Sequence, residues 1–155
     1  MKTAPLLALC AAALMSGCAS VNMASTEEMA KAKQFNPPSA GHAGVYIYRN
    51  SGIVGAALKK DLWIDGQCVG ESARDVFFYT EVEGGKTHKV ETQSELSPNG
   101  LELMFDSGKN YFIRQFIKIG LFVGGADLEQ VSEEQGKKDI APLGLAAPGA
   151  CSSQR

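Results

Sequence analysis

A two-residue turn signal near the middle of the chain constrains the fold more than any other feature of the sequence. Asp65-Gly66 is a dipeptide favoured in type I′ hairpin turns, because both central positions of that turn need a positive φ. Taking the turn literally fixes which residues face each other: Ile64 with Gln67, Trp63 with Cys68, and Leu62 with Val69. The aliphatic members then share one face, and Trp63 and Cys68 share the other. Both faces of this hairpin therefore need a cover.

Further strand signals follow at a spacing of about ten residues, separated by glycine-containing turns. Runs of alternating β-branched or aromatic residues predict strands at residues 45–49, 76–82, 88–92, 101–106, 111–119 and 126–131, with a weaker signal at residues 54–58. We therefore predict an all-β fold, an antiparallel immunoglobulin-like β-sandwich of about seven or eight strands. A small barrel is the alternative.

The start of the chain has the layout of a secretory signal peptide. Met1-Lys2 supplies a positive end, and the apolar run that follows is too short to span a bilayer. The stretch Leu14-Met15-Ser16-Gly17-Cys18 resembles the bacterial lipobox, after which the cysteine becomes the acylated first residue. We therefore expect cleavage before Cys18 and a membrane anchor on it; an ordinary secretory signal that contains a cysteine is the alternative. Ala19 and Ser20 follow without an aspartate, which resembles lipoproteins of the Gram-negative outer membrane whose domain faces the periplasm.

The sequence divides into four segments on this interpretation: a signal peptide at residues 1–17, a lipidated tether at 18–43, a β-sandwich domain at 44–140 and a flexible tail at 141–155. Thr26 could cap a short helix in the tether, ending at Gln34. Ser132 begins a capping-box pattern, which predicts one helical turn before Gly136. The tail is rich in Ala, Pro and Gly, and we expect it to be loose unless Cys151 holds it.

The cysteines limit the chemistry. Once Cys10 is removed with the leader and Cys18 is acylated, Cys68 and Cys151 are the remaining thiols, in a compartment that favours pairing. The sequence leaves open whether they form a disulfide or stay free, because it does not give their separation. Two isolated cysteines and two isolated histidines lack the paired spacing of a zinc site, so we predict no metal and no cofactor. A net charge of −2 without a basic cluster argues against nucleic acid as a partner.

The order of five segments along the chain carries a family resemblance: Val45-Tyr46-Ile47-Tyr48-Arg49, Leu62-Trp63-Ile64-Asp65-Gly66, Val69-Gly70-Glu71, Gly85-Lys86-Thr87-His88, and Gly108-Lys109-Asn110-Tyr111-Phe112-Ile113-Arg114-Gln115. Together they resemble a bacterial envelope lipoprotein family that is catalogued only as a domain of unknown function, in which a lipobox precedes the same order. The similarity covers about residues 26–140. The hairpin also resembles the PEGA-type surface module, although Gly84 stands where that module has proline. The resemblance implies location and fold, and no catalytic residue.

The anchor, together with the missing catalytic constellation, predicts a non-enzymatic outer-membrane lipoprotein. Its sandwich would face the periplasm and serve interaction or envelope structure, with an envelope protein or peptidoglycan as partner. A second hypothesis is a glycan or peptidoglycan-binding module that uses exposed aromatic side chains, with this candidate binding surface: Tyr46, Tyr48, Trp63 and Phe112. A third is an envelope hydrolase built on Asp65, Glu71 and His88. Against it, a lone histidine on the apolar side of a hairpin is more often a hydrogen-bonded packing residue.

Overall fold

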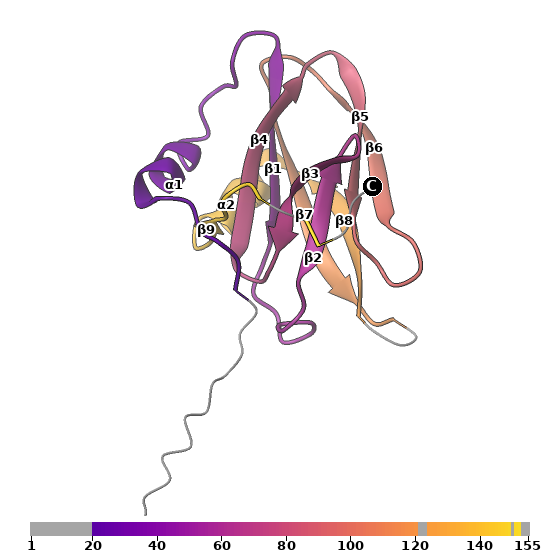
Figure 1. Ribbon diagram of the computed structural model, residues 1–155. Coiled ribbons are helices and arrows are strands. Elements are labelled where there is room, and N and C mark those ends of the chain that lie inside the picture. Colours follow the sequence, from indigo (N-terminus) through magenta and orange to yellow (C-terminus); the bar gives the residue numbers. More distant parts are fainter. Residues whose placement is uncertain (1–19, 121–123, 150, 153–155) are drawn as a thin grey trace, which may run out of the picture.

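The computed structural model describes residues 20–120, 124–149 and 151–152. Within these residues nine strands form two sheets, and two short helices lie outside them (Figure 1). The all-β sandwich predicted from the sequence is confirmed. The predicted signal peptide and Cys18 lie outside the described residues.

The first sheet has the strand order β8-β7-β1-β4-β9. Its strands are, in that order, Gly125–Val131, Asn110–Lys118, His42–Arg49, Val76–Glu83 and Gly144–Leu145. Two of its pairs are parallel, β1 with β7 and β4 with β9, whereas the sequence predicted an antiparallel sandwich. The chain between β1 and β7 passes through the second sheet and can therefore return in the same direction, as a parallel pair requires.

The second sheet has the order β3-β2-β5-β6. Its strands are Gln67–Ser72, Lys60–Ile64, Lys86–Thr92 and Asn99–Phe105. The predicted turn is present, since Asp65 and Gly66 have φ values of 51° and 76°. The first two predicted cross-strand pairs also form, but Leu62 pairs with Gly70 because a bulge shifts the register. The bulge brings β3 against β4: a Cβ on Gly70 would lie 2.5 Å from the ring of Phe78.

Apolar side chains fill two separate layers. Between the sheets lie Val45 and Ile47 of β1 with aliphatic and aromatic partners from both sheets. A second cluster covers the outer face of the first sheet, where Tyr46, Tyr48 and Phe112 pack under the two helices. The hairpin face that carries Trp63 is also covered, because Trp63 is only 2% exposed.

Helix α1 (Thr26–Ala32) packs on the outer face of the first sheet through its buried residue Ala32. Its cap is Ser25 and not the predicted Thr26: the hydroxyl of Ser25 accepts from the backbone N–H of Glu28, whose carboxylate accepts from the N–H of Ser25. The helix ends two residues before the predicted Gln34. Phe35 then takes a positive φ of 52° and places its ring 5.2 Å from that of Tyr46.

Helix α2 (Glu133–Ile140) is longer than the single turn predicted from the sequence. The predicted cap is present, since the hydroxyl of Ser132 accepts from the N–H of Gln135 at 3.2 Å. Gly136 does not end the helix but lies buried within it, where a Cβ would come within 2.3 Å of the ring of Phe112. The missing side chain is therefore what lets α2 lie directly on β7.

The weak strand signal at residues 54–58 is wrong. The chain forms turns there, and Gly55 has a positive φ of 71°. The buried guanidinium of Arg49 donates to the carbonyl oxygens of Leu58 and Gly55, so that backbone acceptors of the segment bind a side chain instead of a neighbouring strand.

The C-terminal residues are attached to the domain at several points. The N–H of Ala146 donates to the carbonyl of Phe77 at 2.8 Å, and Met23 pairs with Ala146 in an isolated bridge. Cys68 and Cys151 form the disulfide that the sequence left open, with Cα atoms 5.9 Å apart. Beyond it, the backbone N–H and hydroxyl of Ser152 donate to the buried carboxylate of Asp61. The tail thus lies over the hairpin face that carries Asp61 and Trp63.

Replacing both Cys68 and Cys151 with serine is expected to lower the free energy of unfolding by about 2–5 kcal/mol, because the bridge closes a long loop in the unfolded chain. The two cysteines are 83 residues apart. Urea unfolding measures the change. Dithiothreitol should lower the midpoint of the parent to that of the double variant and leave the variant unchanged; equal midpoints for the oxidised parent and the variant would contradict the expectation.

Candidate functional site

Strand β4 has an edge that is only partly paired. One side of β4 pairs with β1 along its whole length, but the other pairs with β9 at Val76 and Phe77 alone. Among the described residues, no strand lies beside residues 78–83 on that side. We call this stretch the open edge of β4.

The direction of the free backbone groups follows from the β9 pairing. The carbonyl of Phe77 points away from β1, because it accepts from the N–H of Ala146. Backbone groups of alternate residues in a strand point to the same side, so those of Tyr79, Glu81 and Glu83 also point outward. The open edge therefore presents a short row of main-chain donors and acceptors at Tyr79 and Glu81, whereas the outward carbonyl of Glu83 is already bonded to Nε2 of His88.

A groove of about 470 Å³ runs between the open edge and β3, the edge strand of the second sheet. Its apolar lining includes Ile64, Val69, Phe78 and Val82, while Asp65 and His88 add polar atoms. A second groove, of about 380 Å³, lies between the edge and α1. Four residues line both grooves: Tyr79, Glu81, Ala146 and Pro148. The open edge thus has a pocket on each side.

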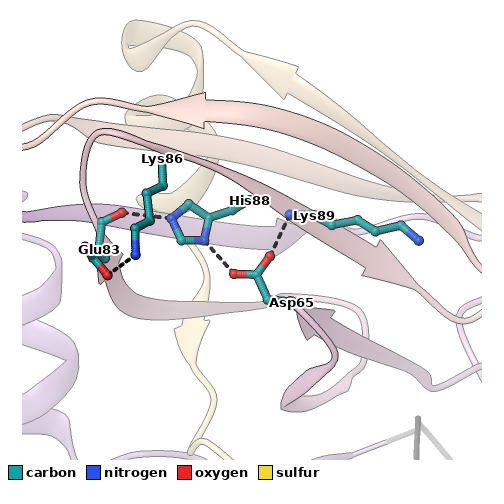
Figure 2. Close-up of polar contacts among 5 residues, drawn as sticks. All are labelled: Asp65, Glu83, Lys86, His88 and Lys89. Atoms are coloured by element: carbon teal, nitrogen blue, oxygen red, sulfur yellow. Dashed lines mark hydrogen bonds and ion pairs between the residues drawn. The ribbon is translucent and has the colours of Figure 1, made fainter.

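A polar network joins the turns beside the first groove (Figure 2). Nδ1 of His88 lies 2.6 Å from the carboxylate of Asp65, and Nε2 lies 2.8 Å from the carbonyl oxygen of Glu83. Asp65 also accepts from the backbone N–H of Lys89 at 2.9 Å. Both ring nitrogens of His88 are occupied, so its arrangement is that of a buried packing residue.

Two carboxylates lie along the open edge. Glu81 accepts from the backbone N–H of Ser39 at 3.1 Å and from the hydroxyl of Tyr79 at 2.8 Å, and the hydroxyl of Ser39 contacts the same carboxylate. The hydrogen bonds from Ser39 are the main reason that the pKa of Glu81 is lowered. The bond from Lys86 lowers the pKa of Glu83 in the same way. Both carboxylates are therefore ionised at neutral pH, and Lys86 offsets the charge of Glu83 but not that of Glu81.

The candidate binding surface predicted from the sequence is not exposed. Tyr46, Tyr48, Trp63 and Phe112 are each at most 2% exposed. The prediction was wrong because the alternation of a strand shows which side chains share a face but not what covers that face. Two helices cover Tyr46, Tyr48 and Phe112, and the C-terminal tail covers the Trp63 face.

The three residues of the hydrolase hypothesis are brought together only in part. Asp65 and His88 are in contact through the carboxylate and Nδ1. Glu71 instead forms an ion pair with Lys59 at 2.8 Å, near the end of β3 that is remote from the turn. No group of three or more His, Cys, Asp or Glu side chains in the described part of the chain is placed to hold a metal ion.

Sequence reasoning missed the open edge. The alternation of Phe78, Thr80 and Val82 correctly indicated a strand, but nothing in it shows that β9 stops pairing at Phe77. A helix long and apolar enough to cross a membrane is not found within residues 20–120, 124–149 and 151–152.

Comparison with known proteins identifies relatives without an assigned activity. The model of a family described as protein of unknown function (DUF2846) matches residues 39–126. A protein of Haemophilus influenzae named "Uncharacterized protein" is 58% identical over 135 residues, which cover 87% of this chain and 79% of the relative. No solved structure matches the chain.

Replacing Asp65 with asparagine should lower the free energy of unfolding by about 1 kcal/mol at neutral pH, since the carboxylate is half exposed and its bonds are screened. Burial raises the pKa of Asp65, but the bonds from Lys89 and His88 outweigh it and leave the pKa below its usual value. Stability from such a group is present above the usual pKa and is lost as the pH falls through the folded-state pKa.

The difference between parent and D65N should therefore shrink as the pH falls below about 4, the usual pKa of an aspartate. Urea unfolding across that range measures it. Glu134→Gln, at an exposed position of α2, controls for the change in net charge. A difference between parent and D65N that stays constant to the lowest pH would contradict the role given to the charged carboxylate.

Proposed function

The chain belongs to the DUF2846 family of proteins of unknown function, and we propose that it is a non-enzymatic lipoprotein of the outer membrane whose periplasmic sandwich binds an extended segment of a partner protein. The binding site is the open edge of β4. The observation that carries the proposal is the unpaired edge with a pocket on each side.

Strand addition uses such an edge directly. The main chain of an extended peptide bonds to the free backbone groups, and its alternate side chains enter pockets on the two sides of the sheet. Here the outward groups of Tyr79 and Glu81, together with the N–H of Glu83, provide the main-chain partners, because the carbonyl of Glu83 is already bonded to His88. The groove beside β3 accepts apolar side chains, because its lining includes Ile64 and Phe78.

Charge narrows the class of partner. Glu81 and Glu83 lie two residues apart on the edge and are both held ionised. A second copy of the chain that added its own β4 in antiparallel would bring like charges together, which disfavours pairing. The segment that fits is one in which apolar residues alternate with basic or neutral ones.

The lipid anchor is supported by the lipobox at residues 14–18. Val21 packs against the core and Met23 pairs with Ala146, so residues 19 and 20 alone separate the proposed acylated cysteine from the folded domain. Ala19 and Ser20, without an aspartate, favour the outer membrane over retention in the inner one.

Glu81→Pro tests the edge, because proline removes an outward N–H that β1 does not use and is tolerated on edge strands. With benzoylphenylalanine at Val82, ultraviolet light should yield a discrete adduct in intact cells. The adduct should be lost in Glu81→Pro and kept in Glu81→Gln, which retains the N–H. The exposed Met104 on β6 is the control position for the crosslinker. An undiminished adduct in a folded Glu81→Pro protein would remove the proposal.

Cys18→Ser tests the anchor. The variant should accumulate as a precursor that keeps residues 1–17 and lacks the mass of the acyl chains, as measured by mass spectrometry. Cys10→Ser changes a cysteine within the expected leader and should be processed normally. Cleavage and acyl mass in Cys18→Ser equal to those of the parent would contradict the assignment of the anchor to Cys18.

A further inference from the structure

We propose that the end of the sandwich at which the described chain begins is a membrane-contacting surface, with apolar loop tips that enter the lipid headgroup region. The inference rests on the proposed acylation of Cys18. It concerns three segments, which we call the basal loops: the β1–β2 loop, the β5–β6 loop and residues 119–120 directly after β7. Figure 1 shows them together at the lower end of the view, where the described part of the chain also starts.

Each basal loop exposes a large aliphatic side chain. Ile53 and Val54 in the β1–β2 loop are 97% and 59% exposed, Leu96 in the β5–β6 loop is 84% exposed, and Ile119 after β7 is 91% exposed. At the opposite end, Met104 near the end of β6 is 57% exposed, and the turns around Asp65 and Gly108 themselves carry none of the exposed large apolar side chains of the described residues. Exposed aliphatic residues are thus concentrated at one end of the sandwich.

The length of chain before the domain indicates what covers this end. Two residues separate Cys18 from Val21, and the three steps from one Cα atom to the other span at most about 10 Å. Val21 itself is fixed: it packs against the core, and it lines a small hollow together with Lys59, at the end of the β1–β2 loop. Acyl chains on Cys18 would therefore hold the basal loops next to the bilayer.

The charges around the loops favour an apolar mode of contact. Lys59 pairs with Glu71, and Lys118 at the end of β7 pairs with Asp127 on β8. Basic side chains that are already neutralised by acidic neighbours add little attraction to anionic lipids. Apolar tips entering the boundary between headgroups and acyl chains then carry the contact, which should depend little on the anionic lipid content.

Tryptophan scanning in vesicles tests this surface with the full, acylated protein. Ile53→Trp, Leu96→Trp and Ile119→Trp are made singly, and Ala40→Trp at an exposed position of the opposite end is the matched control. The proteins are reconstituted into phosphatidylcholine vesicles with bromines on the acyl chains, which quench nearby indoles. The native Trp63 is buried, and the parent protein gives its background.

We expect strong quenching at the three basal positions and at most background quenching at Ala40, with little change when one fifth of the lipid is anionic. If the protein floats with the vesicles but quenching at the basal positions equals that at Ala40, the inference is overturned while the anchor stays intact. The inference is also overturned if the emission of the basal tryptophans shifts with protein concentration but is not quenched by bromine. That result would assign the surface to contact with a second copy of the protein. A protein that lacks the acyl mass and does not float removes the anchor and this inference together.

Discussion

Strand β1 has no free side, and the rest of the structure depends on that constraint. β4 and β7 bond to its two edges, and both of its faces are buried. Val45 and Ile47 require the second sheet as their cover, while Tyr46 and Tyr48 require the helices. The tyrosine hydroxyls also need partners once they are buried.

Each tyrosine of β1 finds its partner in a different covering segment. The hydroxyl of Tyr46 donates to the carbonyl of Ala32, at the end of α1, and that of Tyr48 donates to Asp139 in α2. Burial raises the pKa of both hydroxyls, so they remain protonated donors at neutral pH. One strand thereby fixes both helices, and the position of α1 in turn forms the wall of the second groove beside β4.

Local sequence signals predicted the strands and the hairpin well, but they predicted poorly which segments pack over the faces of those strands. Alternation at residues 45–49 and the Asp65-Gly66 turn indicated strands and a hairpin, because both are set by neighbours in sequence. The face of Tyr46 was misjudged because its cover is a pair of short helices, one of which contains a glycine that usually indicates an end. The cover of Trp63 and the limit of β9 along β4 depend on contacts between distant residues, which no local pattern contains.

The bridge between Met23 and Ala146 has a consequence for how the chain acquires its fold. A chain that is synthesised from its N-terminus makes α1 first, but the segments that hold α1, around Ile140 and Leu145, emerge near the end. Until then, these C-terminal segments do not cover the aromatic face of β1 and β7. A chain interrupted before residue 133 would keep that apolar face in solution, where proteases and chaperones recognise unfinished proteins.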